Sequence, residues 1–406
     1  MSKEIFSYVK LKDVAEVEIS GVDKKIQEDE IWVSLCNFVD VYYNWAITER
    51  KTDSFMRATA KQSEIDKFSL KKGQVAITKD SETKYDIGVA AYIADDFDNV
   101  VLGYHCALIT PDESKLSGKY LNAFFHTKFV QKYFELNATG SGQRFTLSLD
   151  AIKDMPIYLP SLSKQKEVAE IFSKIDRKIE LNEAINDNLE QQIKLIYDYW
   201  FNQFKYPHQH VDSATLSEEF IWNQNVKRKI PTNWSVVKVE TILEKIPTTT
   251  KIATSNYLQD GTIPVIDQST DFIAGYTKDT NALLEKEDGY IVFGDHTRIV
   301  KYIMFPFARG ADGTQVLSSN TKRMPNELLY QAIKQIDLSN FGYARHFKFL
   351  KDTYILLPDE KTAKLFCNIV KPLHRTQSEL TFENINLCKL RDWLLPILMN
   401  GQAYMD

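Results

Sequence analysis

The run LPSLSKQKEVAEIFSKIDRKIELNEAINDNLEQQIKLIYDYWF, residues 159–201, decides the fold of this chain. Its apolar positions recur at alternating spacings of four and three, which is the heptad spacing of a coiled-coil helix. Charged residues such as Glu167 and Lys174 lie off this seam. The pattern predicts one helix of about 35 to 42 residues, or about 50 to 60 Å at 1.5 Å per residue. The seam residues are Val168, Phe172, Ile175, Ile179, Asn182, Asn186, Leu189, Ile193, Ile196 and Trp200.

A second copy of this pattern lies 198 positions further along the chain. The segments IKDMPIYLP (152–160) and LKDTYILLP (350–358) share Lys-Asp and Leu-Pro at that offset, and the helical block that follows keeps the same register. Upstream the match is looser, for example about Gly73 and Gly289. The chain is therefore predicted to be two copies of one unit, a globular block followed by a helical block. The second seam consists of Phe366, Val370, Leu373, Gln377, Leu380, Asn384, Leu387, Arg391, Leu394 and Leu398.

The two predicted helices are the best partners for each other, because a helix of that length with one apolar stripe needs a partner. We expect them to pair as an antiparallel coiled coil whose register is fixed by polar seam residues. Two alternatives stay open: each stripe packs on its own globular block, or the polar residues face water. Pro372 should bend or interrupt the second helix, and Pro396 with Asn400-Gly401 should mark its end. The polar register residues are Asn182, Asn186 and Asn384.

The rest of the sequence forms two globular blocks. Short runs rich in Val, Ile, Tyr and Phe, such as QVAIT (74–78) and YIVFG (290–294), are punctuated by glycines and predict strands. We expect an α+β protein with two mixed α/β domains related by the repeat and separated by the two long helices. The predicted boundaries are 1–159 and 207–357 for the domains, 160–206 for the central helical spacer and 358–406 for the C-terminal helical spacer.

Composition and charge exclude several classes of protein. A net charge of −5, from 50 basic and 55 acidic residues, excludes binding of nucleic acid by bulk charge but leaves local patches open. The four cysteines are far apart, so neither a zinc site nor a disulfide framework is indicated. No apolar run approaches the about 18 residues of a membrane span, and the N-terminus lacks a secretory core. We expect a cytoplasmic chain that binds no metal and no membrane.

No catalytic motif stands out. The sequence lacks a P-loop, the Pro-Pro loop of amino-methyltransferases and a dinucleotide-binding glycine turn. The segment GDHTR (294–298) contains an Asp/His pair, but no nucleophile motif lies near it, which favours a structural or DNA-contacting role. A nuclease site made of scattered Asp, Glu and Lys residues stays open. We expect no enzyme activity and no cofactor in this chain by itself.

Polar and basic loops carry the remaining signal. TGSGQRFTL (139–147) and GYARHFKFL (342–350) each place an arginine just before a helical block, at the same depth in the repeat. Arginine suits guanine, glutamine suits adenine, and lysine more often holds phosphates. The alternative is that these side chains are solvated or cap a helix. The candidates for DNA contact are Lys79, Lys84, Gln143, Arg144, His296, Arg298, Arg309, Gln315, Arg345 and Lys348.

The helical runs carry a family resemblance. Residues 159–201 resemble the central conserved region of the specificity subunit of type I restriction-modification systems, and LRDWLLPILMNGQ (390–402) resembles that family's C-terminal signature. GDHTR (294–298) with RGADGTQVL (309–317) resembles a recurrent pattern of its target recognition domains. The resemblance covers the whole chain in architecture, although the second helical run departs from the first at Pro372 and Gln377.

The resemblance implies two target recognition domains, each reading one half of a two-part double-stranded DNA target, with the paired helices as a ruler. It implies a subunit without an active site that docks two methyltransferase subunits, which methylate adenine. S-adenosylmethionine, ATP and Mg²⁺ are then expected on partner subunits, including restriction and translocase subunits. Two other hypotheses stay open: a structural adaptor that binds proteins through two heads on a rigid spacer, and a stand-alone nuclease or methyltransferase.

Overall fold

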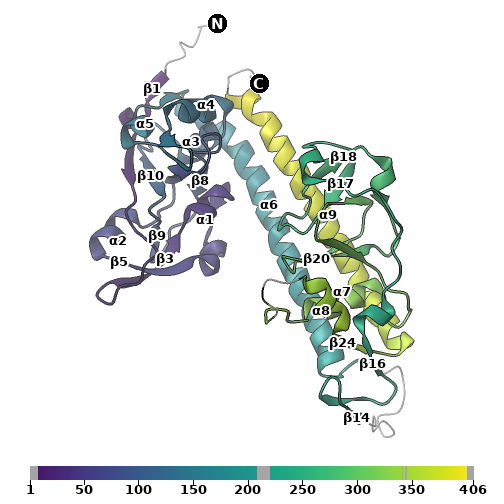
Figure 1. Ribbon diagram of the computed structural model, residues 1–406. Helices are drawn as coiled ribbons and strands as arrows, with labels where there is room; N and C mark the ends of the chain where they lie inside the picture. Colours follow the sequence, from purple (N-terminus) through teal and green to yellow (C-terminus); the bar gives the residue numbers. More distant parts are fainter. Residues whose placement is uncertain (1–7, 208–219, 341, 343–344, 400–406) are drawn as a thin grey trace. The chain divides into compact units, whose positions relative to one another are not determined.

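The computed structural model describes residues 8–207, 220–340, 342 and 345–399. The chain divides into two compact units. Unit 1 holds the residues up to Leu181 together with those from Glu383 onward, and unit 2 holds Asn182–Phe382. Each unit therefore combines one α/β block with a part of each of the two long helices, which Figure 1 draws in teal and yellow.

Unit 1 is built around a five-stranded sheet. Its strands are β2 (Ala15–Ile19), β4 (Ala46–Ile47), β6 (Val75–Thr78), β8 (Ala90–Ile93) and β10 (Cys106–Pro111). Their order is β2–β10–β6–β8–β4, and all neighbours are antiparallel except β4 and β8. Strands β6 and β8 are buried at every position, which explains why they are continuous apolar runs in the sequence.

Smaller sheets and short helices complete the α/β block of unit 1 (Figure 1). One sheet joins β5 (Met56–Ala60), β3 (Ile31–Cys36) and β9 (Val100–Leu102), and another joins β11 (Thr139–Ser141), β12 (Arg144–Thr146) and β7 (Asp80–Ser81). The helices are α1 (Phe38–Tyr42), α2 (Gln62–Phe68), α3 (Gly118–Phe125), α4 (Lys128–Asn137) and α5 (Leu149–Lys153). Helix α3 shares a core with one face of the central sheet, where Tyr120 and Phe124 are clustered with Val75 and Ile77.

The α/β block of unit 2 follows a similar plan. One sheet has the order β21 (Val300–Ile303), β20 (Tyr290–Gly294), β23 (Thr314–Leu317). A second sheet has the order β18 (Gly275–Thr277), β17 (Ile263–Ile266), β22 (Phe307–Arg309), β19 (Leu283–Leu284). Strands β14 (Phe220–Asn223) and β15 (Arg228–Pro231) form a hairpin. Helices α7 (Asn326–Lys334) and α8 (His346–Asp352) complete the block, and Leu328 and Leu329 of α7 share a core with Ile291 and Phe293 of β20.

One pair of strands, present in both blocks, confirms the repeat. In unit 1, β1 (Tyr8–Lys10) pairs antiparallel with β13 (Pro156–Tyr158); in unit 2, β16 (Ser235–Lys238) pairs antiparallel with β24 (Tyr354–Leu357). Each pair is bridged by an ion pair at the same place. Lys10 lies 3.2 Å from Asp154, and Lys238 lies 3.0 Å from Asp352. The aspartates of the Lys-Asp match in the sequence, Asp154 and Asp352, therefore make the same contact in both units.

A second repeated contact surrounds the glycine that precedes β6 and β20. Gly73 and Gly289 both have positive φ, 97° and 64°, a conformation that favours glycine. In unit 1 the first residue of α3, Gly118, approaches so closely that a Cβ there would lie 1.9 Å from the Gly73 carbonyl oxygen. In unit 2 the first residue of α7, Asn326, instead donates from Nδ2 to the Gly289 carbonyl at 2.9 Å.

The two long helices begin at equivalent positions. Helix α6 (Leu162–Tyr197) follows Ser161, whose Oγ accepts from the Lys164 amide at 3.4 Å, and α9 (Glu360–Met399) follows Asp359, whose Oδ1 accepts from the Thr362 amide at 2.9 Å. Both are N-caps, and they are 198 positions apart. All the predicted seam residues of both helices are buried or half-buried, as the heptad pattern requires.

Within each unit the helices run antiparallel to each other. In unit 1, Lys178 pairs with Glu383 at 3.1 Å, and Asn384 donates from Nδ2 to the Ile179 carbonyl at 3.3 Å. In unit 2, Gln377 donates from Nε2 to the Asn186 carbonyl at 3.3 Å and to Glu190 at 3.2 Å. Asn182 is fully buried. The register contacts of Asn186 and Asn384 are therefore bonds between a side chain and a backbone carbonyl.

The seam also packs against the globular blocks. In unit 1, Val168 and Phe172 of α6 and Leu395 and Leu398 of α9 belong to the core that contains the central sheet. In unit 2, Ile193 and Trp200 share a core with Phe366 and Val370 of α9 and with the sheet strand β20. The two alternatives are therefore both correct: each apolar stripe packs on a globular block and also on the other long helix.

The expectation that Pro372 interrupts the second helix is wrong. Helix α9 continues through Pro372 and through Pro396 to Met399. Pro372 and Asn368 are both exposed, so the carbonyl that loses its helical partner at this point can be hydrated. Asn400-Gly401, predicted to mark the helix end, lies outside the described residues.

Candidate nucleic-acid interface

A buried carboxylate gathers the predicted DNA-contacting residues of unit 1. Asp80 begins β7, separated from the end of β6 by Lys79 alone, and is 8% exposed. Its carboxylate lies 2.8 Å from Lys79 Nζ, 2.7 Å from His105 Nδ1, 2.5 Å from Thr146 Oγ1 and 3.6 Å from Arg144 Nη2. Strand β12 carries Arg144 and Thr146 and pairs with β7. The sheet register therefore brings two of the candidates, Lys79 and Arg144, to one anion.

This carboxylate is held in its ionised form. Burial by itself would raise the pKa of Asp80, but the hydrogen bonds from His105, Lys79 and Thr146 outweigh burial and lower the pKa below its ordinary value. An ionised carboxylate can only accept hydrogen bonds. His105 Nδ1 therefore carries its hydrogen toward Asp80, a tautomer that follows from the hydrogen-bond network.

The remaining candidates of unit 1 lie beside this cluster. Gln143 is exposed in the turn between β11 and β12, one residue before Arg144. Lys84 lies on the loop after β7, where its Nζ is 5.6 Å from the centre of the Tyr85 ring. Tyr85 itself is 73% exposed. The structure thus brings Lys79 and Arg144 together, whereas no contact within the described residues joins Lys84 to them.

In unit 2 the side chain of Gln268 ties loops together. Gln268 Oε1 accepts from the His296 amide at 3.1 Å, and Gln268 Nε2 donates to the Asp312 carbonyl at 3.0 Å. Thr297 Oγ1 donates to the Gln268 carbonyl at 2.7 Å. Gly313 has a φ of 77°, and a Cβ there would lie 2.5 Å from Gln268 Nε2. The two segments that resemble a target-recognition pattern, 294–298 and 309–317, are therefore adjacent in space.

The aspartate of the GDHTR segment has a structural role. Asp295 is 5% exposed, its carbonyl accepts from the His346 amide at 3.0 Å, and its Oδ1 accepts from the Phe347 amide at 2.8 Å. These bonds hold the first turn of α8 against the loop. His296 is exposed beside them, and Arg345 is exposed immediately before α8.

The candidate Arg309 has a buried hydrogen-bond donor without a partner among the described residues. It ends β22, and the donor is its Nε. Burial lowers the pKa of its guanidinium below the ordinary value. A nearby cation, Lys301, differs in this respect: its Nζ donates to the carbonyls of Asp267, at 3.0 Å, and Asp271. Lys301 therefore serves the loop, whereas Arg309 still has donor capacity.

The other candidates of unit 2 are scattered around this region. Arg298 has a φ of 62° and donates from Nη1 to the Leu338 carbonyl at 3.4 Å. Gln315 is half-buried on β23, opposite Phe293 of β20. Lys348 is exposed on α8. No contact within the described parts of unit 2 joins these three residues to one another.

The same junction appears in both units. The Leu147 amide donates to the Lys79 carbonyl at 2.8 Å, and the His346 amide donates to the Asp295 carbonyl at 3.0 Å. In unit 1 the segment that carries Arg144 contacts the residue after β6, and in unit 2 the segment that carries Arg345 contacts the residue after β20. Both strands follow the repeated glycine, Gly73 or Gly289. The equal depth of the two arginines in the sequence repeat thus has a counterpart in space.

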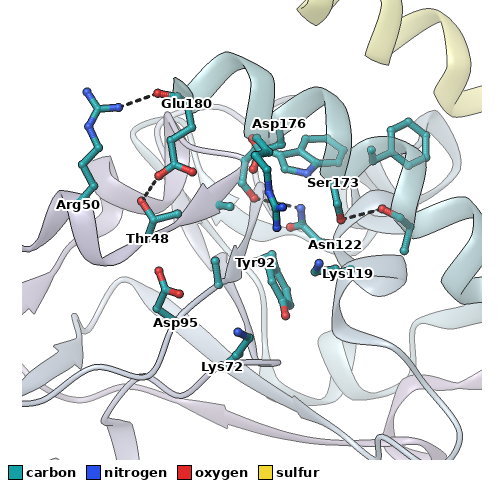
Figure 2. A pocket seen from close by; sticks show the side chains of 16 residues that line it. Thr48, Arg50, Lys72, Tyr92, Asp95, Lys119, Asn122, Ser173, Asp176 and Glu180 are labelled. Atoms are coloured by element: carbon teal, nitrogen blue, oxygen red, sulfur yellow. Dashed lines mark hydrogen bonds between the residues drawn. The ribbon is translucent and has the colours of Figure 1, made fainter. Parts of the chain in front are cut away.

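Unit 1 also contains a pocket of about 280 Å³ between its α/β block and α6, shown in Figure 2. Glu180 of α6 accepts from Thr48 Oγ1 at 2.6 Å, and its carbonyl accepts from Arg50 Nη1 at 2.9 Å. Lys72 and Lys119 line the pocket from the block, whereas Asp176 lines it from the helix. These contacts fasten the loop after β4 to α6.

Two negative findings bound the chemistry of the described residues. They contain no group of three or more His, Cys, Asp or Glu side chains placed to hold a metal ion. None of their helices is long and apolar enough to cross a membrane.

Comparison with known proteins finds type I specificity subunits. Residues 4–191 match the family model described as the type I restriction modification DNA specificity domain. The chain is also 24% identical to the specificity subunit of the type I restriction enzyme MjaIX of Methanocaldococcus jannaschii, over 98% of this chain and 93% of that protein. The chain is thus similar to type I specificity subunits over nearly its whole length.

Two further comparisons point the same way. The specificity subunit of the type I restriction enzyme HindI of Haemophilus influenzae is 26% identical over 34% of this chain and 30% of that protein. The crystal structure of the S subunit of a type I restriction-modification system from M. genitalium has the same fold, with a TM-score of 0.55 and 15% identity. That comparison covers 100% of this chain and 99% of the other. The fold predicted from the sequence, two related α/β domains with two long paired helices, is confirmed.

Sequence reasoning missed three side chains that organise these loops. Asp80, His105 and Gln268 were not among the candidates. Asp80 had a signal, since it follows the candidate Lys79 directly after an apolar strand. His105 and Gln268 had none, because their partners lie 25 and 28 positions away and meet them only through sheet pairing and loop closure.

Proposed function

We propose that this chain is the DNA sequence-specificity subunit of a type I restriction-modification complex. Each α/β block reads one half of a two-part double-stranded DNA target, and the paired helices set the spacing between the halves. The observation that carries the proposal is the repeated junction, which places Arg144 in unit 1 and Arg345 in unit 2 beside equivalent loops. The similarity to type I specificity subunits supports the same function.

The chain recognises DNA and catalyses nothing by itself in this proposal. It docks two methyltransferase subunits, which bind S-adenosylmethionine, and restriction and translocase subunits, which use ATP and Mg²⁺. The net charge of −5 agrees with a shared DNA-binding surface, because counterion release by the complex depends on the basic residues of all its subunits. The specific contacts of this chain then come from a few placed side chains rather than from a polycationic face.

Reconstitution with the methyltransferase subunit tests the proposal. The two proteins are expressed together and purified on a tag carried by this chain, and genomic DNA treated with the complex is mapped for methylated adenine. We expect a stable complex and methylation at one sequence made of two fixed parts around an unspecified gap. A complex that does not form, or that modifies no such site, contradicts the proposal. Binding of other proteins without salt-dependent binding of duplex DNA would favour the adaptor hypothesis.

The ruler is tested by shortening both helices together. The contacts of Asn384 with Ile179 and of Gln377 with Asn186 share one antiparallel register, so residues 181–187 are matched by residues 376–382. Deletion of both segments removes one heptad from each helix and keeps the seams in phase. Seven residues correspond to about 10 Å, or about 3 base pairs at 3.4 Å each. We expect a gap shorter by about 3 base pairs with both half-sites unchanged; an unchanged gap refutes the ruler.

A further inference from the structure

We propose that Asp80 is a positioning residue for DNA reading by unit 1. It acts by holding the His105 ring, against which the Arg144 guanidinium lies, and by pairing its charge with that guanidinium. This inference rests on the proposed function, because it assigns a residue-level arrangement to the DNA-reading surface of the first α/β block.

The three side chains contact one another. His105 Nδ1 lies 2.7 Å from Asp80 Oδ2 and donates to it. Arg144 Nη2 lies 2.5 Å from His105 Nδ1 and 2.9 Å from Nε2, so the guanidinium lies against the ring between its two nitrogens. The same Nη2 lies 3.6 Å from Asp80 Oδ2, which makes the carboxylate the anion that pairs with Arg144.

The Asp80 carboxylate is itself held in place. Thr146 Oγ1 donates to Oδ1 at 2.5 Å, and Lys79 Nζ donates to Oδ2 at 2.8 Å. The side chain of Asp80 is 11% exposed, that of His105 is 22% exposed and that of Arg144 is 58% exposed. Exposure to solvent therefore increases from the Asp80 carboxylate, through the His105 ring, to the Arg144 guanidinium.

Arg144 keeps most of its donors for a ligand. Among the described residues, its contacts with His105 and Asp80 all involve Nη2. Both two-pronged edges of a guanidinium include Nη2, which carries two hydrogens. The Nη2 hydrogen that does not face His105, together with a hydrogen of Nη1 or Nε, can meet a base edge that presents two acceptors, and guanine presents O6 and N7 in the major groove. A bidentate contact requires the guanidinium plane to be oriented in advance, which the contacts with His105 and Asp80 provide.

The Asp80 carboxylate should affect specific and non-specific DNA binding in opposite directions. Asp80 carries a negative charge close to the surface that faces phosphates, so it opposes non-specific binding of DNA while it supports specific reading. Replacing Asp80 with Asn keeps the size of the side chain. The amide oxygen can take the place of Oδ2, which accepts from both Lys79 and His105, and the amide nitrogen can donate to the Thr146 hydroxyl. D80N therefore removes the negative charge that pairs with Arg144 while it can keep these hydrogen bonds.

The experiment uses the complex reconstituted with its methyltransferase subunit. The probes are duplexes that contain the mapped target and duplexes in which each base pair of one half-site is replaced. We expect D80N to lose about 5- to 100-fold in discrimination at one G·C pair, the amount that a bidentate contact supplies. Binding to duplexes without the target should stay equal or become tighter. R144K and R144A should lose discrimination at the same base pair.

Two controls separate positioning from folding and from charge. E18Q removes one negative charge from the same block at an exposed ion pair, Lys67 with Glu18 at 2.9 Å, and should leave discrimination unchanged. H105A removes the ring that Arg144 contacts but keeps the bonds of Asp80 with Lys79 and Thr146. If D80N does not fold, H105A still tests the inference. In an R144A background, D80N should cause no further loss, because both changes remove one contact.

Several results would overturn the inference. These are a D80N or H105A complex with full discrimination, a D80N effect that adds in full to that of R144A, and weakening of all duplexes by the same factor. A wild-type complex that recognises no split site would instead refute the proposed function. The two failures are therefore distinguishable.

Discussion

Unit 1 should lose stability when the pH falls, because of His126. The His126 ring stacks on Trp45 at 4.3 Å between ring centres and 18° between planes, and the Arg391 guanidinium lies 4.4 Å from the Trp45 ring. The Nε2 atom of His126 lies 3.0 Å from the Ala90 carbonyl oxygen. Burial, with a smaller contribution from the Arg391 charge, lowers the pKa of His126 from 6.5 to about 4.

The sign of the effect follows from proton linkage. Between pH 6.5 and pH 4 the unfolded chain has a protonated His126 and the folded chain a neutral one, so the unfolded state binds more protons and acid favours unfolding. At 1.4 kcal/mol per pKa unit, the loss between pH 7 and pH 4.5 is about 2.5 kcal/mol. Because the ring is only half-buried, this value is an upper limit. Below about pH 4 the loss should stop growing, since both states are then protonated.

The measurement compares the full chain with its H126Q variant. Glutamine can still donate to the Ala90 carbonyl but does not titrate in this range. Urea unfolding at a series of pH values gives two curves, and their difference removes the contributions of all other groups, including the buried His374 in unit 2, whose pKa burial also lowers. The wild type should fall below the variant by up to about 2.5 kcal/mol between pH 7 and pH 4.5. H296Q, which changes an exposed imidazole, serves as the control. Parallel curves for wild type and H126Q would refute the reasoning.

Other substitutions test packing and the interface. Phe366 is fully buried against Trp200 and Phe201, so F366A should lower the free energy of unfolding of unit 2 by about 3–5 kcal/mol in urea, and a loss below 1 kcal/mol would contradict its core role. G118A should destabilise unit 1 by about 1–3 kcal/mol, because its Cβ would lie 1.9 Å from the Gly73 carbonyl; an unchanged thermal midpoint would show that the close approach is not needed. R309M should leave stability equal or up to about 1 kcal/mol higher, because a buried unpaired donor is removed, yet weaken specific DNA binding in filter or anisotropy assays; unchanged binding would remove Arg309 from the interface.

The architecture could be predicted from the sequence because its signals are periodic or repeated. Each heptad seam depends on a stripe of positions, so no single residue decides it, and a polar residue such as Asn182 still occupies a buried seam position. The Lys-Asp match at Asp154 and Asp352 marked a repeated ion pair. The effect of Pro372 could not be predicted, because it depends on which face of the helix is exposed.

The details of the interface depend on contacts that no local pattern records. Arg144 and Lys79 were named as candidates because basic side chains bind DNA. That they share one partner, Asp80, and that Arg144 contacts His105 follow from the pairing of β7 with β12 and from the turn before β10. In unit 2, Gln268 joins loops that are distant in the sequence. Roles in DNA reading stay predictions for every candidate.

The division of the chain has a consequence for its synthesis. Unit 2 is one continuous stretch, Asn182–Phe382, whereas unit 1 takes residues from both sides of it. The core of unit 1 includes Leu395, Leu398 and Met399, which a ribosome makes only after the whole of unit 2. At about 5–20 residues per second, the first block must wait about 10–40 s for these side chains while the second block is translated. During that time the apolar surface around Phe172 lacks part of its cover, and a stop codon between Phe382 and Leu395 would damage the block that was translated first.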